Sequence, residues 1–306
     1  MSNTVYNNII VDAFSELVPS LHIAPLDLSK MRASEGVCNL SDIFKTDRCI
    51  SLHKKARYTI TVALEDLYLK KEDVVTILTT SGNFYVSGCV TKAIEAVCQW
   101  NREVTNDTKA ILVIHEFGYP YKGLSDLKKY GLPIIEDCAY AFFSKDEEIG
   151  TIGDYVIYSM PKAFNMQMGG VMISQNQIED CVSQEEREYI VSSLSAQWQD
   201  RDAIIHQRIE NHNYLAATLA PLGIQPFFEL IDGVVPGVFM FRWRDEFDYP
   251  VLKEFMQRNG VESSVFYGQH AFFIPTHQNL TEKELDYMVS LLRFYYETCN
   301  KKEERL

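Results

Sequence analysis

The feature that most constrains the fold is a series of short apolar segments in the middle of the chain. Each segment is rich in β-branched residues and is bounded by turn-forming or charged residues, which is the pattern of a buried strand. We predict these strands at 110–118, 132–140, 154–160 and 169–174. A short helical segment lies between the first two strands and ends at Gly131. Strands that alternate with helices indicate an α/β fold, in which a mostly parallel sheet is covered on both faces.

The residues before this series extend the same pattern. Apolar residues recur at helical spacing from about residue 57, which predicts an amphipathic helix. These residues are Ile60, Ala63, Leu64 and Leu67. A β-branched run at 74–78 predicts another buried strand, and the segment 90–100 predicts a further helix. We therefore expect all of these elements to belong to the same α/β domain.

The C-terminal part of the chain has a different pattern of predicted helices and strands. A long polar helical stretch runs to Pro221, and the final helix opens with a capping box formed by Thr281 and Glu284. The elements predicted between them are strands at 237–243 and 261–268 and a helix at 249–260. This mixture indicates an α+β domain. We expect a larger domain over residues 1–185 and a smaller C-terminal domain over residues 186–306.

Composition argues against several classes of function. The 306 residues are 46% hydrophobic and 23% charged, as in a folded globular protein. A formal net charge of -13 argues against nucleic-acid binding, which needs a basic face. The chain has no apolar run long enough to predict a membrane span, and its start lacks the basic residues of a secretory signal.

The seven cysteines are widely and irregularly spaced, and none of them forms a C-x-x-C pair. This spacing disfavours both a disulfide framework and a zinc site. We therefore predict reduced thiols in a cytoplasmic protein that holds no metal ion.

Three polar residues stand at the ends of neighbouring predicted strands. Asp137 lies near the end of one strand, and Ser159 and Lys162 lie at the end of the next. Taken singly, each can be an ordinary solvated or capping residue. Ligands of parallel sheets bind at the carboxyl ends of the strands, however, and a carboxylate, a hydroxyl and an amine are the polar groups of a pyridoxal phosphate site. Apolar neighbours such as Phe164 favour a desolvated, reactive Lys162.

The order of these motifs resembles the central block of the DegT/DnrJ/EryC1/StrS aminotransferase family. The matching motifs are Ile114-His115, "GLPIIEDCA", "GTIGD", and "YSMPK" followed by Gly169-Gly170. Flanking segments are also similar, so the resemblance covers roughly residues 54–295. It implies a fold of the aspartate-aminotransferase type. In this fold a large domain with three layers, αβα, binds pyridoxal phosphate, and a smaller α+β domain follows it.

The resemblance implies roles for individual residues. Lys162 matches the catalytic lysine that forms a Schiff base with the cofactor, and Asp137 matches the aspartate that keeps the pyridine nitrogen protonated. Tyr140 stands where the family has Gln or His near the cofactor hydroxyl, and Ser159 resembles a serine that contacts the phosphate. The start of the preceding helix is expected to hold the phosphate through its backbone N–H groups. The residues expected there are Arg57, Tyr58 and Thr59.

The function implied by the resemblance is a transaminase, active as a homodimer in cell-surface polysaccharide biosynthesis. We expect it to act on a keto group of a nucleotide-linked sugar or a related small metabolite, with glutamate as the amino donor. Some positions differ from the family: Ala56 replaces a glycine, and Met168 replaces an acidic residue. These differences leave open a catalytically inactive homologue that serves as a binding or regulatory subunit. Cofactor-dependent dehydration is a third hypothesis, which the presence of Lys162 disfavours.

Overall fold

The computed structural model of the chain describes residues 21–33, 38–243 and 247–303. Contacts divide these residues into two compact units. The larger unit contains Pro25–Ile205 and Ile231–Pro236, and the smaller unit contains the remaining described residues. The expected domain boundary after residue 185 falls inside helix α5, which lies wholly in the larger unit. The prediction that the chain starts without a secretory signal concerns residues outside the described ranges.

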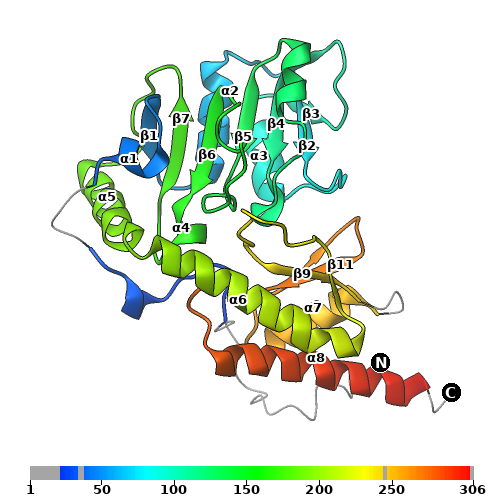
Figure 1. Cartoon of the computed structure of the whole chain (residues 1–306). Coiled ribbons are helices and arrows are strands. Elements are labelled where there is room, and N and C mark those ends of the chain that lie inside the picture. The colour runs from blue at the N-terminus through cyan, green and yellow to red at the C-terminus, as the bar shows by residue number, and fades with distance from the viewer. Residues whose placement is uncertain (1–20, 34–37, 244–246, 304–306) are drawn as a thin grey trace. The chain divides into compact units, whose positions relative to one another are not determined.

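The larger unit is built on a seven-stranded sheet within the described residues (Figure 1). Its strands are β1 (Cys49–His53), β2 (Val74–Thr79), β3 (Gln99–Asn101), β4 (Thr108–Ile114), β5 (Ile134–Asp137), β6 (Tyr155–Ser159) and β7 (Gly170–Ser174). They lie in the order β1-β7-β6-β5-β4-β2-β3. The five strands from β6 to β3 are parallel to one another, whereas β7 is antiparallel to both β6 and β1.

Helices and 3-10 turns cover both faces of this sheet, as the nearly continuous burial of the strand residues requires. They are η2 (Leu28–Lys30), α1 (Leu40–Phe44), α2 (Ala56–Asp66), α3 (Gly88–Glu95), η3 (Glu116–Gly118), η4 (Ser125–Tyr130), α4 (Met160–Ala163) and α5 (Gln184–Trp198). Helices α2 and α3 pack on one face through Ile60, Leu64 and Ile94, and the other face packs against η4 and α5. The predicted three-layer αβα fold is confirmed.

The sequence assigned some of these elements wrongly. The helix predicted at 90–100 ends at Glu95, and its last residues form the short strand β3 beside β2. Alternation alone did not separate this strand from the helix, because Cys98 continues the apolar stripe of α3 into the core. The strand predicted at 169–174 is confirmed as β7, and it runs antiparallel to β6, a direction that the sequence left open.

The smaller unit is an α+β arrangement with its own core. Its sheet of four antiparallel strands has the order β10-β11-β9-β8. The elements are β8 (Gln225–Pro226), β9 (Phe239–Arg242), β10 (Ser264–Phe266), β11 (Ala271–Ile274), η5 (Ala220–Leu222), α7 (Tyr249–Arg258), α8 (Glu282–Glu303) and most of α6 (Arg201–Leu219). Phe241 and Phe272 of the sheet pack with Phe255 of α7 and Leu292 of α8.

The start of α8 has the predicted capping box. The backbone N–H of Thr281 donates to the Glu284 carboxylate at 2.7 Å, and the backbone N–H of Glu284 donates to the Thr281 hydroxyl at 3.4 Å. These two bonds satisfy donors that the first turn of a helix leaves unpaired. The helix therefore begins where the sequence placed it.

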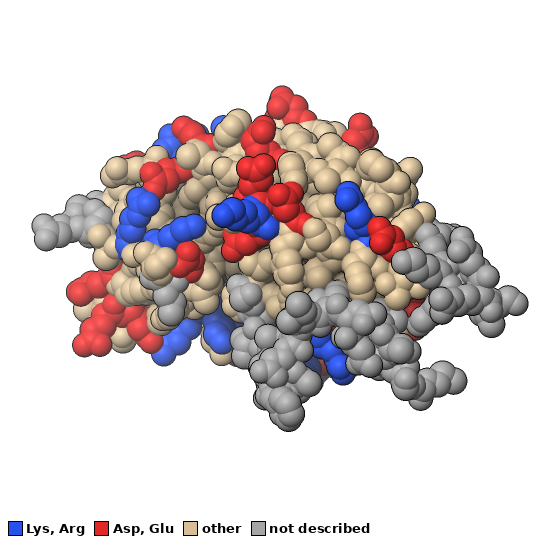
Figure 2. Space-filling view, turned by 90° about the horizontal axis from the view of Figure 1, so that it is seen from below, with Lys and Arg blue, Asp and Glu red and all other residues tan. Residues whose placement is uncertain are grey.

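Charged side chains are interspersed over the surface. On the face shown in Figure 2, acidic and basic residues alternate among neutral ones, and the described basic residues there form no continuous patch. Within the part of the chain that the structure describes, no helix is both long enough and apolar enough to cross a membrane.

Candidate active site

The strand order brings the predicted polar residues to one edge of the sheet. Strands β5 and β6 are parallel neighbours, so Asp137 and Ser159 both lie at carboxyl ends. Strand β7 runs the other way, which places its first residue, Gly170, opposite Ser159. Lys162 follows in α4, a single turn that starts directly after β6. The edge therefore collects a carboxylate, a hydroxyl and an amine from segments that are separate in the sequence.

Lys162 lies partly buried at this edge, and burial lowers the pKa of its amine below the usual lysine value. The negative charge of Asp137 opposes this effect and raises the pKa, and the Cys89 thiol acts in the same direction. The positive charge of Arg57 lowers the pKa further. An amine with a lowered pKa is a better nucleophile and proton acceptor at neutral pH.

Asp137 is a nearly buried carboxylate, with 8% of its surface exposed. Its Oδ1 atom accepts a hydrogen bond from the backbone N–H of Ala139 at 2.9 Å. That bond fixes the side chain at the end of β5. The negative charge of Asp137 raises the pKa of the Lys162 amine.

Tyr140 lies under the amine of Lys162. The Lys162 Nζ atom is 3.7 Å from the centre of the Tyr140 ring, well inside the range of a cation–π contact. The ring of Phe117 packs on Tyr140, with the two ring centres 5.2 Å apart and the planes tilted by 36°. The structure thus places the ring face of Tyr140 against the amine of Lys162.

The start of α2 lies at the same edge. Its N-cap residue, Lys55, makes no side-chain capping bond, although its carbonyl accepts a hydrogen bond from the N–H of Tyr58 at 3.0 Å. The first two N–H groups of the helix precede this bond and can serve another acceptor. Gly170 of β7 passes directly beneath this start: a Cβ atom on Gly170 would lie 2.5 Å from the Lys55 carbonyl carbon and 2.6 Å from the Ala56 nitrogen. Only glycine fits this approach, which brings the open helix end to the strand that pairs with Ser159.

The three residues expected at the phosphate differ in their environments. Arg57 and Tyr58 are exposed, and Arg57 is close enough to influence the charge of Lys162. Thr59 is fully buried, and its hydroxyl donates to the carbonyl of Ala56 at 2.6 Å. The roles of these residues, and of Ser159, stay predictions. The hydroxyl of Thr59 is already engaged within its own helix.

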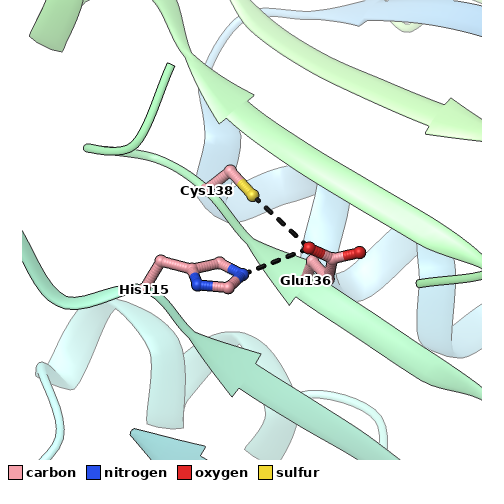
Figure 3. Close-up of side chains that lie close together, drawn as sticks. All are labelled: His115, Glu136 and Cys138. Carbon is pink, nitrogen blue, oxygen red and sulfur yellow. Dashed lines mark hydrogen bonds and ion pairs between the residues drawn. The ribbon is translucent and has the colours of Figure 1, made fainter. Parts of the chain in front are cut away.

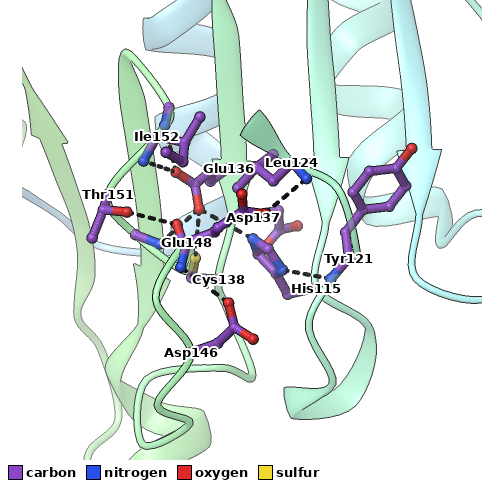
Figure 4. Close-up of polar contacts among 12 residues, drawn as sticks. His115, Tyr121, Leu124, Glu136, Asp137, Cys138, Asp146, Glu148, Thr151 and Ile152 are labelled. Carbon is purple, nitrogen blue, oxygen red and sulfur yellow. Dashed lines mark hydrogen bonds and ion pairs between the residues drawn. The ribbon is translucent and has the colours of Figure 1, made fainter. Parts of the chain in front are cut away.

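Glu136, the neighbour of Asp137, is the centre of a buried network on the other side of β5. Its Oε2 atom accepts hydrogen bonds from the backbone N–H of Gly150 at 2.7 Å and from the His115 ring at 3.1 Å. Its Oε1 atom accepts from the N–H groups of Ile152, at 3.1 Å, and Gly153. Figure 4 shows these bonds joining β5 to the turn before β6. Glu136 is therefore a structural carboxylate.

The protonation of His115 follows from its partners. The backbone N–H of Tyr121 donates to Nδ1 at 3.0 Å, so Nδ1 has no proton and Nε2 carries the one that Glu136 accepts. His115 and Cys138 both point toward Glu136 (Figure 3). Such a trio resembles a metal-ligand set, but the histidine nitrogens and both oxygens of the carboxylate are engaged by protein donors and acceptors. The geometry therefore supports a structural role for His115.

The loop after β4 was not identified from the sequence as part of the site. Phe117 has a backbone φ of 54°, in the left-handed region that residues other than glycine rarely occupy. Glu116, before it, is buried and accepts a hydrogen bond from the backbone N–H of Ser81 at 2.6 Å. Burial raises the pKa of this carboxyl group. A buried acid beside a strained residue at a strand end is visible only in the structure.

A pocket of about 570 Å³ opens at the carboxyl ends of β2 and β3. It is lined by Leu78, Thr79, Gly82, Phe84, Asn101, Arg102, Glu103, Thr105 and Tyr121. The chain passes from β2 to β3 on one side of β2, and from β4 to β5 on the other side. The pocket therefore lies near a topological switch point of the sheet. Lys162 and Asp137 are not among its lining residues.

Comparison with solved structures identifies the class of protein that has this fold. The aminotransferase TlmJ from Streptoalloteichus hindustanus superposes with a TM-score of 0.70 at 15% identity, over 85% of this chain and 89% of that one. A sugar aminotransferase, Spr1654 from Streptococcus pneumoniae in its PMP form, gives 0.69 at 15% identity, over 89% and 94%. The fold is the one shared by sugar aminotransferases of this kind.

Sequence comparison matches the central segment of the chain to one family. The model of the DegT/DnrJ/EryC1/StrS aminotransferase family matches residues 93–183, which include Asp137, Ser159 and Lys162. GDP-perosamine synthase from Escherichia coli O157:H7 is 34% identical over 88 residues, which are 26% of this chain and about a quarter (24%) of the enzyme. The resemblance to this family is thereby confirmed on the central segment, which carries the candidate site.

Proposed function

We propose that the protein is a pyridoxal-phosphate-dependent aminotransferase that acts on a keto group of a nucleotide-linked sugar or a related small metabolite. The observation that carries the proposal is the meeting of Lys162, Asp137 and the open start of α2 at one sheet edge. An amine with a lowered pKa, a nearly buried carboxylate and the first N–H groups of a helix match the three polar functions of the cofactor: aldehyde, ring nitrogen and phosphate.

Pyridoxal phosphate, when bound, supplies an electron-accepting ring that stabilises negative charge on the carbon of the amino group being transferred. Asp137 is suited to hold a protonated ring nitrogen, because a nearly buried carboxylate makes a strong ion pair. The α2 start, with Ser159 nearby on β6, is suited to hold a phosphate. The residues present therefore fit this cofactor.

Lys162 is the residue that we assign to catalysis. Burial lowers the pKa of its amine, so a larger fraction is neutral at physiological pH than for an exposed lysine. A neutral amine can attack a carbonyl carbon and can later accept and return a proton on one face of the substrate. Asp137 limits this effect, because its charge favours the protonated amine.

The substrate class is proposed from the relatives. GDP-perosamine synthase is 34% identical over 88 residues, and one structural neighbour, Spr1654, is named as a sugar aminotransferase. We further propose glutamate as the amino donor, as the sequence resemblance implied, and a homodimer as the active form. The seven cysteines, all within the described residues, form no disulfide, which supports a cytoplasmic location.

The test is covalent capture of the cofactor. The full-length protein is mixed with pyridoxal phosphate, reduced with borohydride and digested, and the modified peptide is located by mass spectrometry. We expect the adduct on Lys162 and none in Lys162→Met. Lys129→Met is a matched control, because Lys129 also lies over a tyrosine ring, at 5.1 Å, but on the surface of η4.

Unfolding of the variant does not explain a loss of the adduct. Because the folded-state pKa of Lys162 is lowered, its charge costs stability at pH 7, and this cost disappears as pH rises through the unfolded value. Lys162→Met is therefore expected to be at least as stable as the native protein at neutral pH. Absence of an adduct in the native protein at saturating cofactor contradicts the proposal and favours the inactive homologue. Conversion of added glutamate to 2-oxoglutarate then separates transaminase from passive binder.

A further inference from the structure

The contact between Lys162 and Tyr140 uses the face of the ring. At 3.7 Å from the ring centre, the Lys162 ammonium meets the negative face of the π system, where the attraction is strongest. Both residues are partly buried, so solvent weakens this attraction less than it does on an open surface. The hydroxyl of Tyr140 is at the rim of the ring and plays no part in this contact.

The ring of Tyr140 is itself supported from one side. Phe117 packs on it with the ring centres 5.2 Å apart, and Phe117 holds a left-handed backbone conformation, with φ of 54°. This conformation costs on the order of 1–2 kcal/mol for a residue with a side chain, so surrounding bonds must enforce it. The position of Phe117 is therefore set by the loop rather than by its own preference.

Hydrogen bonds fix the loop on both sides of Phe117. The Thr80 hydroxyl accepts from the backbone N–H of Glu116 at 3.0 Å and donates to the carbonyl of Tyr119 at 2.8 Å. The Ser144 hydroxyl donates to the carbonyl of Gly118 at 2.7 Å. A side chain on Gly118 is excluded, because its Cβ would overlap a backbone carbonyl oxygen. The loop therefore presents Phe117 in one place.

From this geometry we infer that Tyr140 is a positioning residue that holds the Lys162 amine through its aromatic face, and that Phe117 fixes that face. The inference rests on the proposed role of Lys162 and refines the expected role of Tyr140, which was a hydrogen bond through its hydroxyl. A ring face accepts a cation from many directions along its axis, so it can hold the amine without a fixed hydrogen bond.

The inference predicts that two substitutions of Tyr140 have different effects on the pKa of Lys162. Tyr140→Phe keeps the aromatic face and removes the hydroxyl, whereas Tyr140→Leu removes the face. The ring face favours the charged amine, so its loss is expected to lower the pKa of Lys162 by about one unit, and loss of the hydroxyl is expected to leave that pKa unchanged. Phe117→Leu removes the support and is expected to lower the pKa by a smaller amount.

The other charged groups near Lys162 come from different elements and are the same in all variants. They are Asp137 on β5, Cys89 on α3 and Arg57 on α2. A difference in the pKa of Lys162 between variants is therefore caused by the substituted aromatic ring. The pKa is measured on the full-length protein, freed of aldehydes with hydroxylamine, by trace labelling with acetic anhydride across pH and quantifying each lysine by mass spectrometry. The exposed Lys109 serves as an internal reference.

The outcomes separate the two proposals, since labelling needs no cofactor. Equal shifts in Tyr140→Phe and Tyr140→Leu assign the role to the hydroxyl and overturn the inference, and so does an unchanged pKa in Tyr140→Leu. If Tyr140→Leu does not fold, a shift in Phe117→Leu supports the inference and its absence contradicts it. A protein that shows the expected shifts but forms no adduct with pyridoxal phosphate retains this geometry and loses only the proposed enzymatic function.

Discussion

Replacement of Glu136 by glutamine tests the buried network that supports the site. The side chain is 0% exposed. Its Oε1 atom accepts hydrogen bonds from two backbone N–H groups, and its Oε2 atom accepts from a backbone N–H, the His115 ring and, at 3.9 Å, the Cys138 thiol. The amide of glutamine can place an oxygen at only one of these positions. Whichever way it turns, an NH₂ group faces at least two donors, and the hydrogen bonds there are lost.

His115 cannot relieve this conflict by changing its tautomer. If Nε2 lost its proton to accept from the amide, Nδ1 would carry the proton and face the N–H of Tyr121, which now donates to it at 3.0 Å. Hydrogen bonds to a charged group contribute about 1.5–3 kcal/mol each, so the loss of two predicts that Glu136→Gln destabilises the larger unit by about 3–6 kcal/mol. That is a large share of the stability of a typical domain.

The assay is urea denaturation combined with amide hydrogen exchange of the turn before β6. Hydrogen exchange measures the stability of the larger unit by itself. A spectroscopic signal from the whole protein combines the unfolding of two units that need not unfold together. The amides of Gly150 and Ile152 are expected to lose protection in Glu136→Gln. Glu147→Gln is the matched control, because Glu147 is exposed in the same loop, and its effect is expected to stay within about 0.5 kcal/mol. Similar stability for the two variants, with protection retained, refutes the reasoning.

Two further predictions concern a backbone approach and a buried histidine. Gly170→Ala places a Cβ 2.5 Å from the backbone of Lys55, so we expect the start of α2 to move and pyridoxal phosphate to bind about tenfold more weakly. Cofactor titration measures this, with Gly88→Ala as the control, since a Cβ there meets nothing within 4 Å. Burial lowers the pKa of His212 to about 4. The unfolded state therefore takes up the proton first, and the smaller unit is expected to lose about 3 kcal/mol as pH falls from 6.5 to 4. Acid denaturation of His212→Phe should show less of this loss.

The sequence predicted the parts of the fold that depend on local pattern. Alternating short apolar runs and helices identified the sheet, and Thr281 with Glu284 marked the start of α8. The direction of β7 was not predicted, because a short apolar run has the same composition in either direction. Strand β1 was missed altogether, since Cys49–His53 has no long hydrophobic run and is identified by its pairing with β7.

The candidate site was predicted in part for the same reason. Asp137 and Lys162 follow apolar strands, so their positions at the sheet edge could be expected from the order of elements alone. The packing of Phe117 on Tyr140 could not be predicted, because it depends on a positive φ of Phe117 that long-range hydrogen bonds impose. Neither could the close approach of Gly170 to the start of α2, which is a contact between distant segments.

The neighbouring carboxylates of β5 show how one strand serves both the fold and the site. Successive side chains of a strand point to opposite faces, so Glu136 and Asp137 cannot share a pocket. Glu136 accepts hydrogen bonds from five donors and binds β5 to the turn that leads into β6, the strand that carries Lys162 at its end. Asp137, on the other side, acts on the charge of Lys162. The buried acid fixes the start of β6 against β5, and the carboxyl ends of these two strands carry the second acid and the amine. For this reason we expect a change at Glu136 to alter the pKa of Lys162 without any contact between them.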